Sequence, residues 1–236
     1  MIICPLTSDE CPKLIPPLPK TVFIMSPSKK KTTPELKEVI ENIKSALEQH
    51  SLKYIEGSAI IDYGDYLCSI CRRILGCTFG IAISSIDISK PTLCNIFWEK
   101  GLMEGFGKPV VLFLDKNINL PSDFTRTFTI FFDRKNYLRK FSDLLQTLKE
   151  LRKHYSDVLG DIALRAGDYE KAGKYYQEAY LIEENPEDMK KIGQLIKTLG
   201  KAANIPSGFK ERLHQSLLAF KKGVQSKNTN YATRKK

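Results

Sequence analysis

The chain has 236 residues and is 42% hydrophobic, so it is long enough to bury a core as one large domain or two small ones. Its net charge is +10, which makes nucleic acid or another polyanion a partner to consider. No segment approaches the ~18 apolar residues that span a bilayer, and the first twenty residues do not resemble a signal peptide, so we expect a cytoplasmic protein without a membrane segment.

The six cysteines do not form a recognisable metal motif. Cys68 and Cys71 have the spacing of a zinc-ligand pair, but no second pair and no histidine lies close to them in the sequence. We expect reduced thiols, with structural disulfides or a metal site as alternatives. The six positions are Cys4, Cys11, Cys68, Cys71, Cys77 and Cys94.

The first predicted elements are a leader, a strand and a helix. Residues 1–20 are rich in proline and are expected to be extended, without regular structure. Thr21 to Met25 is a short apolar run typical of a buried strand. A polar loop follows, and Thr33-Pro34 then supplies an N-cap with proline at the first helical position of an amphipathic helix that runs to about Gln49.

The loop after the first strand is a candidate phosphate contact. Ser26 and Lys29, at the carboxyl end of that strand, could bind phosphate through a hydroxyl and an ammonium group. The alternative is a solvated turn, because the loop lacks the glycine spacing of a phosphate-binding P-loop.

A second strand is predicted at Leu52 to Glu56, and the loop after it carries Asp62 and Tyr63. These two side chains are candidates for contacts with a ribose or a base, and ordinary turn chemistry is the alternative. Asp65 is the expected N-cap of the following helix.

Two apolar runs without polar alternation, Phe79 to Ser84 and Val110 to Leu114, predict strands buried on both faces of a parallel sheet. The helix between them is predicted to start near Asn95 and to end at Gly105 to Gly107. Its sheet-facing stripe is predicted to be Trp98, Leu102 and Phe106.

That helix and the strand before it carry the main candidate site residues. Glu99 is expected in the first turn or so of the helix, at the ligand crevice of an open α/β sheet. Ser84 and Ser85, at the end of the strand, are candidate contacts for sugar hydroxyls, and Asp87 is the nearest acidic residue upstream of Glu99. The alternative for Glu99 is an ordinary first-turn glutamate stabilised by the helix dipole.

A fifth strand, Thr127 to Phe132, and a long helix, Tyr137 to Leu151, complete the alternation of strands and helices. The pattern predicts an α/β fold, with a flavodoxin-like, doubly wound, five-stranded parallel sheet in the order 2-1-3-4-5 over residues 20–151.

Residues 152–224 are predicted to be all α-helical. Small and aromatic residues fall there at the spacing of one tetratricopeptide repeat, which cannot bury its own face alone, so we expect this region to dock on the sheet, on another copy or on a partner protein. Residues 225–236 are predicted to be a basic, disordered tail. The repeat positions are Leu159, Gly160, Gly167, Tyr169, Ala172, Tyr176 and Ala179.

The run NIFWEKGLMEGFGKPVVLF resembles the pattern of the nucleoside 2-deoxyribosyltransferase-like and TIR-like superfamily. The resemblance extends over roughly residues 20–151, including Lys20 to Pro27 and Leu120 to Asp133. It implies that Glu99 attacks or stabilises the anomeric carbon of a nucleoside or of NAD, and that NAD or a nucleotide is the ligand, with no other cofactor and no metal. The positions that match the superfamily pattern are Asn95, Glu99, Gly101, Gly107, Lys108 and Pro109.

Two departures from the pattern count against true base exchange. Leu93 stands where the deoxyribosyltransferases keep an aspartate, and Lys100 replaces an apolar residue. NAD cleavage remains, because nicotinamide leaves as a neutral molecule and needs no second acid.

Two functions follow from the sequence. The first is an N-glycosidase-type enzyme that hydrolyses NAD or a related nucleotide, with residues 152–224 driving self-assembly or partner docking. The second is a non-catalytic nucleotide-sensing or adaptor module that uses the same helical region. Nucleic-acid binding is a third idea, and it rests on charge alone.

Overall fold

The structure is a computed structural model that divides into two compact units, residues 20–148 and residues 1–19 with 149–236. Each unit is described by itself. The structure describes Cys4, Cys11 and residues 15–28, 32–57, 66–118, 128–132, 136–202 and 205–233, the last of these without side chains beyond residue 225.

The first unit contains the predicted five-stranded sheet, with all strands parallel and in the order 2-1-3-4-5. The flavodoxin-like fold class is therefore confirmed. The central strands β1 and β3 are fully buried because helices cover both faces of the sheet. The strands are β1 (Thr21–Met25), β2 (Lys53–Glu56), β3 (Phe79–Ser84), β4 (Val110–Asp115) and β5 (Phe128–Phe132).

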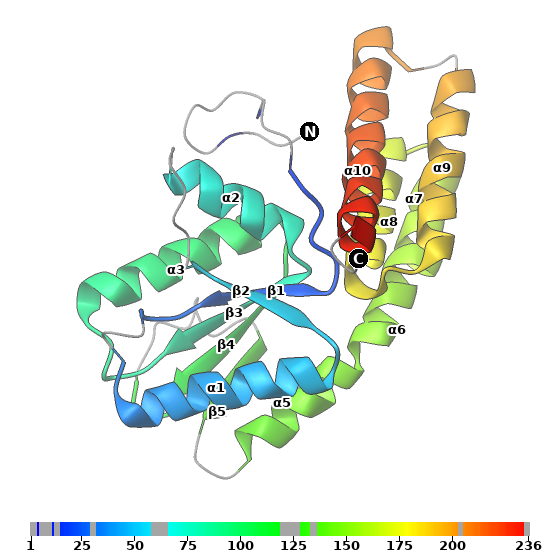
Figure 1. Ribbon diagram of the computed structural model, residues 1–236. Helices are drawn as coiled ribbons and strands as arrows, with labels where there is room; N and C mark the ends of the chain where they lie inside the picture. The colour runs from blue at the N-terminus through cyan, green and yellow to red at the C-terminus, as the bar shows by residue number, and fades with distance from the viewer. Residues whose placement is uncertain are drawn as a thin grey trace. The chain divides into compact units, whose positions relative to one another are not determined.

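Two layers of helices enclose the sheet (Figure 1). Helices α1 (Pro34–Gln49) and α5 (Tyr137–Gln146) lie on one face, and α2 (Tyr66–Gly76) and α3 (Lys90–Gly105) lie on the other. The chain thus turns to opposite faces after β1 and after β3. In an open α/β sheet, this divergence creates a crevice at the carboxyl ends of the two strands.

Helix α1 forms as the sequence predicts. Thr33 is its N-cap, and the Thr33 hydroxyl accepts a hydrogen bond from the backbone N–H of Leu36 at 3.4 Å. Its apolar face is buried against the sheet, and Asn42 Nδ2 donates to the Tyr137 hydroxyl of α5 at 3.2 Å.

Helix α3 corrects three predictions. It starts at Lys90, with Ser89 as N-cap, because Pro91 suits the first turn of a helix. Asn95 is therefore inside the helix, and Glu99 lies in its third turn. The predicted stripe was wrong: the buried residues of α3 are Ile96, Glu99, Lys100 and Met103.

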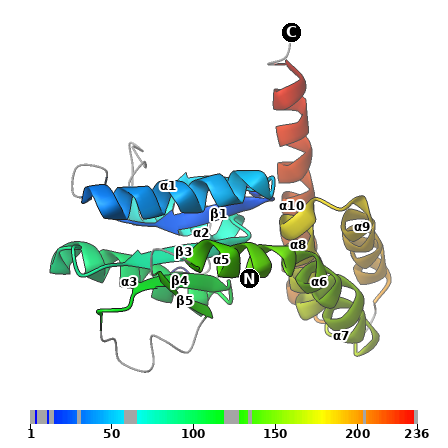
Figure 2. The same ribbon diagram turned by 90° about the horizontal axis from the view of Figure 1, so that it is seen from below.

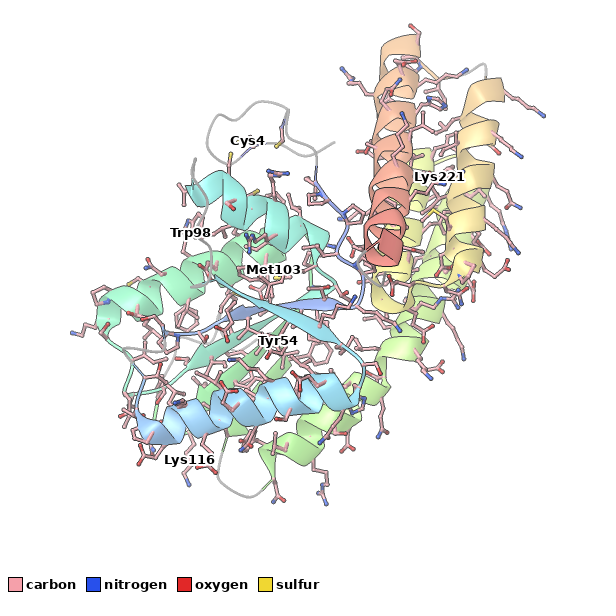
Figure 3. All side chains as sticks on the ribbon, in the orientation of Figure 1. Cys4, Tyr54, Trp98, Met103, Lys116 and Lys221 are labelled. Carbon is pink, nitrogen blue, oxygen red and sulfur yellow. The ribbon has the colours of Figure 1, made fainter. Side chains whose placement is uncertain are left out.

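Trp98 was predicted to face the sheet, but it is 44% exposed. In Figure 3, Trp98 lies on the side of α3 away from the sheet, whereas Met103 lies between α3 and the sheet. Apolar residues occur all around α3, so their spacing does not define a unique buried face.

From residue 149 onward, the regular structure of the second unit is helical in the part of the chain that is described. The long helix predicted for 137–151 is interrupted at Thr147 and then continues, through a π-helical segment, to Arg165. The helices pack around a core that includes Ala172, Tyr176, Ile192, Leu195 and Leu217. The elements are α6 (Leu148–Lys153), the π-helix η3 (His154–Gly160), α7 (Asp161–Arg165), α8 (Tyr169–Glu183), α9 (Pro186–Lys201) and α10 (Ser207–Thr233).

Two contacts join helices of this unit: one joins η3 to α8, and the other joins α6 to α9. A Cβ at Gly160 would lie 2.4 Å from Tyr176 Cε1, so only glycine allows η3 to approach α8 this closely. Arg152 Nε and Nη2 donate to the fully buried Asp188 carboxylate at 3.0 and 2.9 Å. The tetratricopeptide motif itself stays a prediction.

The described residues near the two ends of the chain differ in secondary structure. Residues 15–18 have no regular structure, as predicted for the leader. Helix α10 continues to Thr233, and residues 234–236 lie outside the described residues, so the disordered tail stays a prediction. Residues 224–233 contain no proline or glycine to end the helix.

In the part of the chain that the structure describes, none of the helices has the length and apolarity that crossing a membrane requires. All six cysteines are described, and no disulfide joins them. Cys94 is exposed on α3, whereas Cys4, Cys71 and Cys77 are buried.

Candidate active site

Strand register decides which side chains face α3. Alternate residues of β3 point to opposite faces of the sheet, and a Cβ at Gly80 would lie 2.5 Å from Met103 Sδ of α3. Gly80 therefore faces α3, and Ala82 and Ser84 share that face. Ser84 is fully buried at the carboxyl end of β3, and its hydroxyl has no hydrogen-bond partner among the described residues.

Glu99 points from α3 onto the same face of the sheet. A Cβ at Gly57, directly after β2, would lie 3.2 Å from one Glu99 carboxylate oxygen, 3.3 Å from the other and 3.4 Å from Cζ of Phe23. The carboxylate therefore lies beside the carboxyl end of β2, near the Phe23 ring from the middle of β1. Glycine at position 57 leaves the space that the carboxylate occupies.

The Glu99 carboxyl group has no charged partner among the described residues. The residue is only 9% exposed, and no hydrogen bond or ion pair reaches its carboxyl group from that part of the chain. The neighbouring buried Lys100 binds Glu104 instead, at 2.7 and 2.8 Å. Burial therefore raises the pKa of Glu99 from 4.5 to about 7.

A carboxyl group with a pKa of about 7 is present in both protonation states near neutral pH. It can accept or donate a proton, or bear a negative charge when a positive charge arrives beside it. Buried carboxyl groups with a strongly raised pKa are common at functional sites, and burial in a structural role also raises the pKa.

A second polar group lies at the carboxyl edge, on the other side of β3. The Ser85 hydroxyl donates to Asp115 Oδ2 at 3.4 Å and accepts from the backbone N–H of Asp87 at 3.3 Å. Asp87 Oδ2 accepts from the Thr33 hydroxyl at 3.4 Å. These bonds join the start of α1 to the loop after β3 and to the end of β4.

Sequence reasoning missed Asp115 and Thr33 as members of this group. Asp115 ends β4, and Asn117 donates to its carboxylate from the backbone at 2.9 Å. An aspartate followed two residues later by asparagine, directly after an apolar strand, is a turn pattern that could have identified the position.

The other predicted site residues do not gather around Glu99. Asn95 is exposed on α3, and no hydrogen bond joins it to Glu99. Ser26 lines a small hollow of about 20 Å³ on the α1 side of the sheet, which has room for one or two water molecules and no more. Lys29, Asp62 and Tyr63 lie outside the described residues.

The charged side chains that line the hollow beside Ser26 form ion pairs with one another. Lys44, on α1, forms ion pairs with Glu41 at 2.9 Å and with Glu56. Burial alone would lower the pKa of Lys44, but the hydrogen bonds to Glu56 and Glu41 outweigh it, and the pKa is raised. Glu99 does not line this hollow.

No protein-family model, no curated protein and no solved structure matches this chain. The resemblance to the deoxyribosyltransferase-like and TIR-like superfamily therefore stays a prediction. No group of three or more His, Cys, Asp or Glu side chains that could hold a metal ion occurs in the described ranges.

Proposed function

We propose that the chain is an N-glycosidase-type enzyme that hydrolyses NAD or a related nucleotide, with Glu99 as its catalytic carboxylate. One observation carries the proposal: Glu99 is buried beside Gly57 at the carboxyl end of β2, has no partner among the described residues, and has a pKa of about 7. An unpaired buried charge is costly for folding, so a function that requires it is a reasonable explanation for its presence.

The chemistry needs a negative charge under the sugar. As the bond from the anomeric carbon to the nicotinamide nitrogen breaks, positive charge develops on the sugar ring, and nicotinamide departs with the bonding electron pair as a neutral molecule. Glu99 in its ionised form would stabilise that charge. Water then forms the new bond to the anomeric carbon, and its proton passes to Glu99 or to solvent.

The cationic nicotinamide ring would itself ionise Glu99. A positive charge nearby favours the carboxylate, so binding of NAD should lower the pKa of Glu99 and release a fraction of a proton at pH 7. NADH, whose nicotinamide ring is uncharged, should release less. Calorimetric titration with each nucleotide, in two buffers of different ionisation enthalpy, measures this difference.

The polar residues at the edge of the sheet would hold the rest of the ligand. Ser84, with its unpartnered hydroxyl on the Glu99 face, is the proposed contact for a sugar hydroxyl. Ser85 and Asp87 lie beside the divergence of the chain after β1 and β3, where ligands bind in folds of this type. Residues 152–224 would mediate self-association or partner binding in the cytoplasm.

A non-catalytic nucleotide-sensing module is the second candidate. It is favoured by the small size of the hollow beside Ser26 and by the absence of Glu99 from its lining, because that hollow would not bring a nucleotide to the carboxylate. In that case the helical unit would report nucleotide binding to a partner.

The decisive experiment is an assay for nicotinamide release from NAD by the full chain at high protein concentration. The proposal expects turnover by the wild type, loss of turnover in Glu99→Gln and normal turnover in Glu48→Gln, which removes an exposed glutamate of α1. Nucleotide binding without turnover would favour the sensor. Turnover that survives Glu99→Gln would refute the assignment of Glu99.

A further inference from the structure

The positive charge of the chain is concentrated in one helical hairpin. Residues 186–236 contain twelve lysine and arginine residues and three acidic residues, so their net charge of +9 is nearly that of the whole chain, +10. Residues 149–185 of the same unit contain six basic and eight acidic residues. The hairpin is formed by α9 and α10, which lie side by side and antiparallel (Figure 1).

Among the basic side chains of the hairpin that the structure describes, most have no carboxylate partner. Lys190 and Lys191 pair with Glu187 and with Asp157, and Lys210 donates to two backbone carbonyls at the end of α9. Five other basic side chains of the hairpin have no ion pair or hydrogen bond within the described residues. They are Lys197, Lys201, Arg212, Lys221 and Lys222, of which Lys221 is labelled in Figure 3.

The exposed face of α9 has a regular arrangement. Lys190, Gln194, Lys197 and Lys201 are all exposed and lie at the i, i+4, i+7, i+11 spacing of one helix face, so they follow a line about 16 Å long. Of the three acidic residues of the hairpin, Glu187 pairs with Lys190, and Asp188 is buried against Arg152. The third, Glu211, accepts a hydrogen bond from Gln215 at 2.8 Å.

The exposed face of the hairpin lacks the apolar side chains with which proteins bind lipid surfaces or single-stranded nucleic acid. None of the large exposed hydrophobic side chains of the described residues lies on α9 or α10, and Phe209 and Phe220 pack against the core of the unit. An amphipathic helix that binds a lipid surface inserts exposed apolar residues, and a site for single-stranded nucleic acid stacks bases on exposed aromatic rings. Neither feature is present on this face.

We propose that the α9–α10 hairpin binds the phosphodiester backbone of double-stranded nucleic acid, without reading its sequence. Flexible, unpaired lysines suit phosphate groups, and contacts to the backbone carry no sequence information. Such binding releases counterions, so the affinity falls steeply with salt concentration. The inference does not depend on Glu99 or on the proposed glycosidase activity.

The test is fluorescence anisotropy of the full chain with a labelled 24-base-pair DNA duplex, repeated with an RNA duplex and with single-stranded DNA, at several salt concentrations. We expect micromolar affinity near physiological salt and the same order of affinity for unrelated duplex sequences. The variant K197Q/K201Q/R212Q/K222Q should bind at least about tenfold more weakly. Its slope of log affinity against log salt concentration should be shallower by about 3 to 4.

The matched control is R139Q/K140Q/K149Q/K174Q, which removes four exposed charges elsewhere and changes the net charge by the same amount. It should keep most of the affinity and slope. Equal losses in both variants would mean that only net charge matters, and the proposal would be wrong. It would also be wrong if no duplex bound, or if vesicles with anionic lipids bound and nucleic acid did not.

Discussion

Replacing Glu99 with glutamine should stabilise the protein, and the gain should depend on pH. Glutamine has nearly the same shape as glutamate, but it cannot ionise. In the folded state the pKa of Glu99 is about 7 instead of 4.5, because the carboxyl group is buried without a partner. Between these two values the folded chain holds a proton that the unfolded chain has lost.

The sign and size of the effect follow from this difference. The stabilising contribution of protonated Glu99 is fully present below about pH 4.5 and is lost as the pH rises through about 7. Each pKa unit corresponds to about 1.4 kcal/mol, so ionised Glu99 costs up to about 3 kcal/mol at pH 8 and less than about 1 kcal/mol at pH 5. Glu99→Gln should therefore gain about 2 kcal/mol more at pH 8 than at pH 5.

Urea unfolding followed by tryptophan fluorescence measures this gain in the correct part of the chain. Trp98 is the one tryptophan in the sequence and lies on α3 beside position 99, so its emission reports on the unit that contains the sheet. Glu48→Gln, an exposed position on α1, controls for the change in net charge. A gain in stability that is the same at both pH values, or a loss at pH 8, would refute the reasoning.

Four further substitutions test the packing and the polar contacts. Gly160→Ala should destabilise the helical unit by about 2 kcal/mol or more, because the added Cβ overpacks against Tyr176. Gly193→Ala in α9 should stabilise it by about 0.5–1 kcal/mol, because the added Cβ meets no atom within 4 Å. Thermal unfolding followed by circular dichroism compares the two variants. Asp188→Ala should cost about 3–5 kcal/mol in urea unfolding, because it leaves the Arg152 guanidinium buried without its carboxylate, and a cost under 1 kcal/mol would contradict that. Ser84→Ala should leave stability unchanged or raise it by about 1 kcal/mol, since the hydroxyl has no partner, but should weaken NAD binding in calorimetry if the hydroxyl contacts the sugar.

The sequence by itself determined the fold class. Strands such as Thr21–Met25 and Phe79–Ser84 are short, continuous apolar runs, and a parallel sheet buried on both faces requires this pattern. The alternation with helices and the right-handed crossover rule then leave few possible strand orders. Local signals were equally reliable at Thr33-Pro34, where both the cap and the fixed backbone angle of proline act within one turn.

The orientation of α3 was decided by tertiary structure alone. Periodicity identifies a buried face only where polar and apolar residues separate, and on α3 they do not. The sheet and α2 select the side of the helix with Ile96 and Met103, which leaves Trp98 exposed and turns Glu99 inward. No local preference of the residues from 90 to 105 contains that information.

The same distinction separates the candidate site into two parts. The sequence identified Glu99, Ser84 and Ser85 by their place after or between strands, which topology fixes. It could not show that the Glu99 carboxylate has no partner among the described residues, that Gly57 gives it room, or that Ser85 bonds to Asp115. These contacts depend on atoms far apart in the chain that only folding brings together. The raised pKa of Glu99, on which the proposed chemistry depends, is therefore a property of the folded protein and not of the motif.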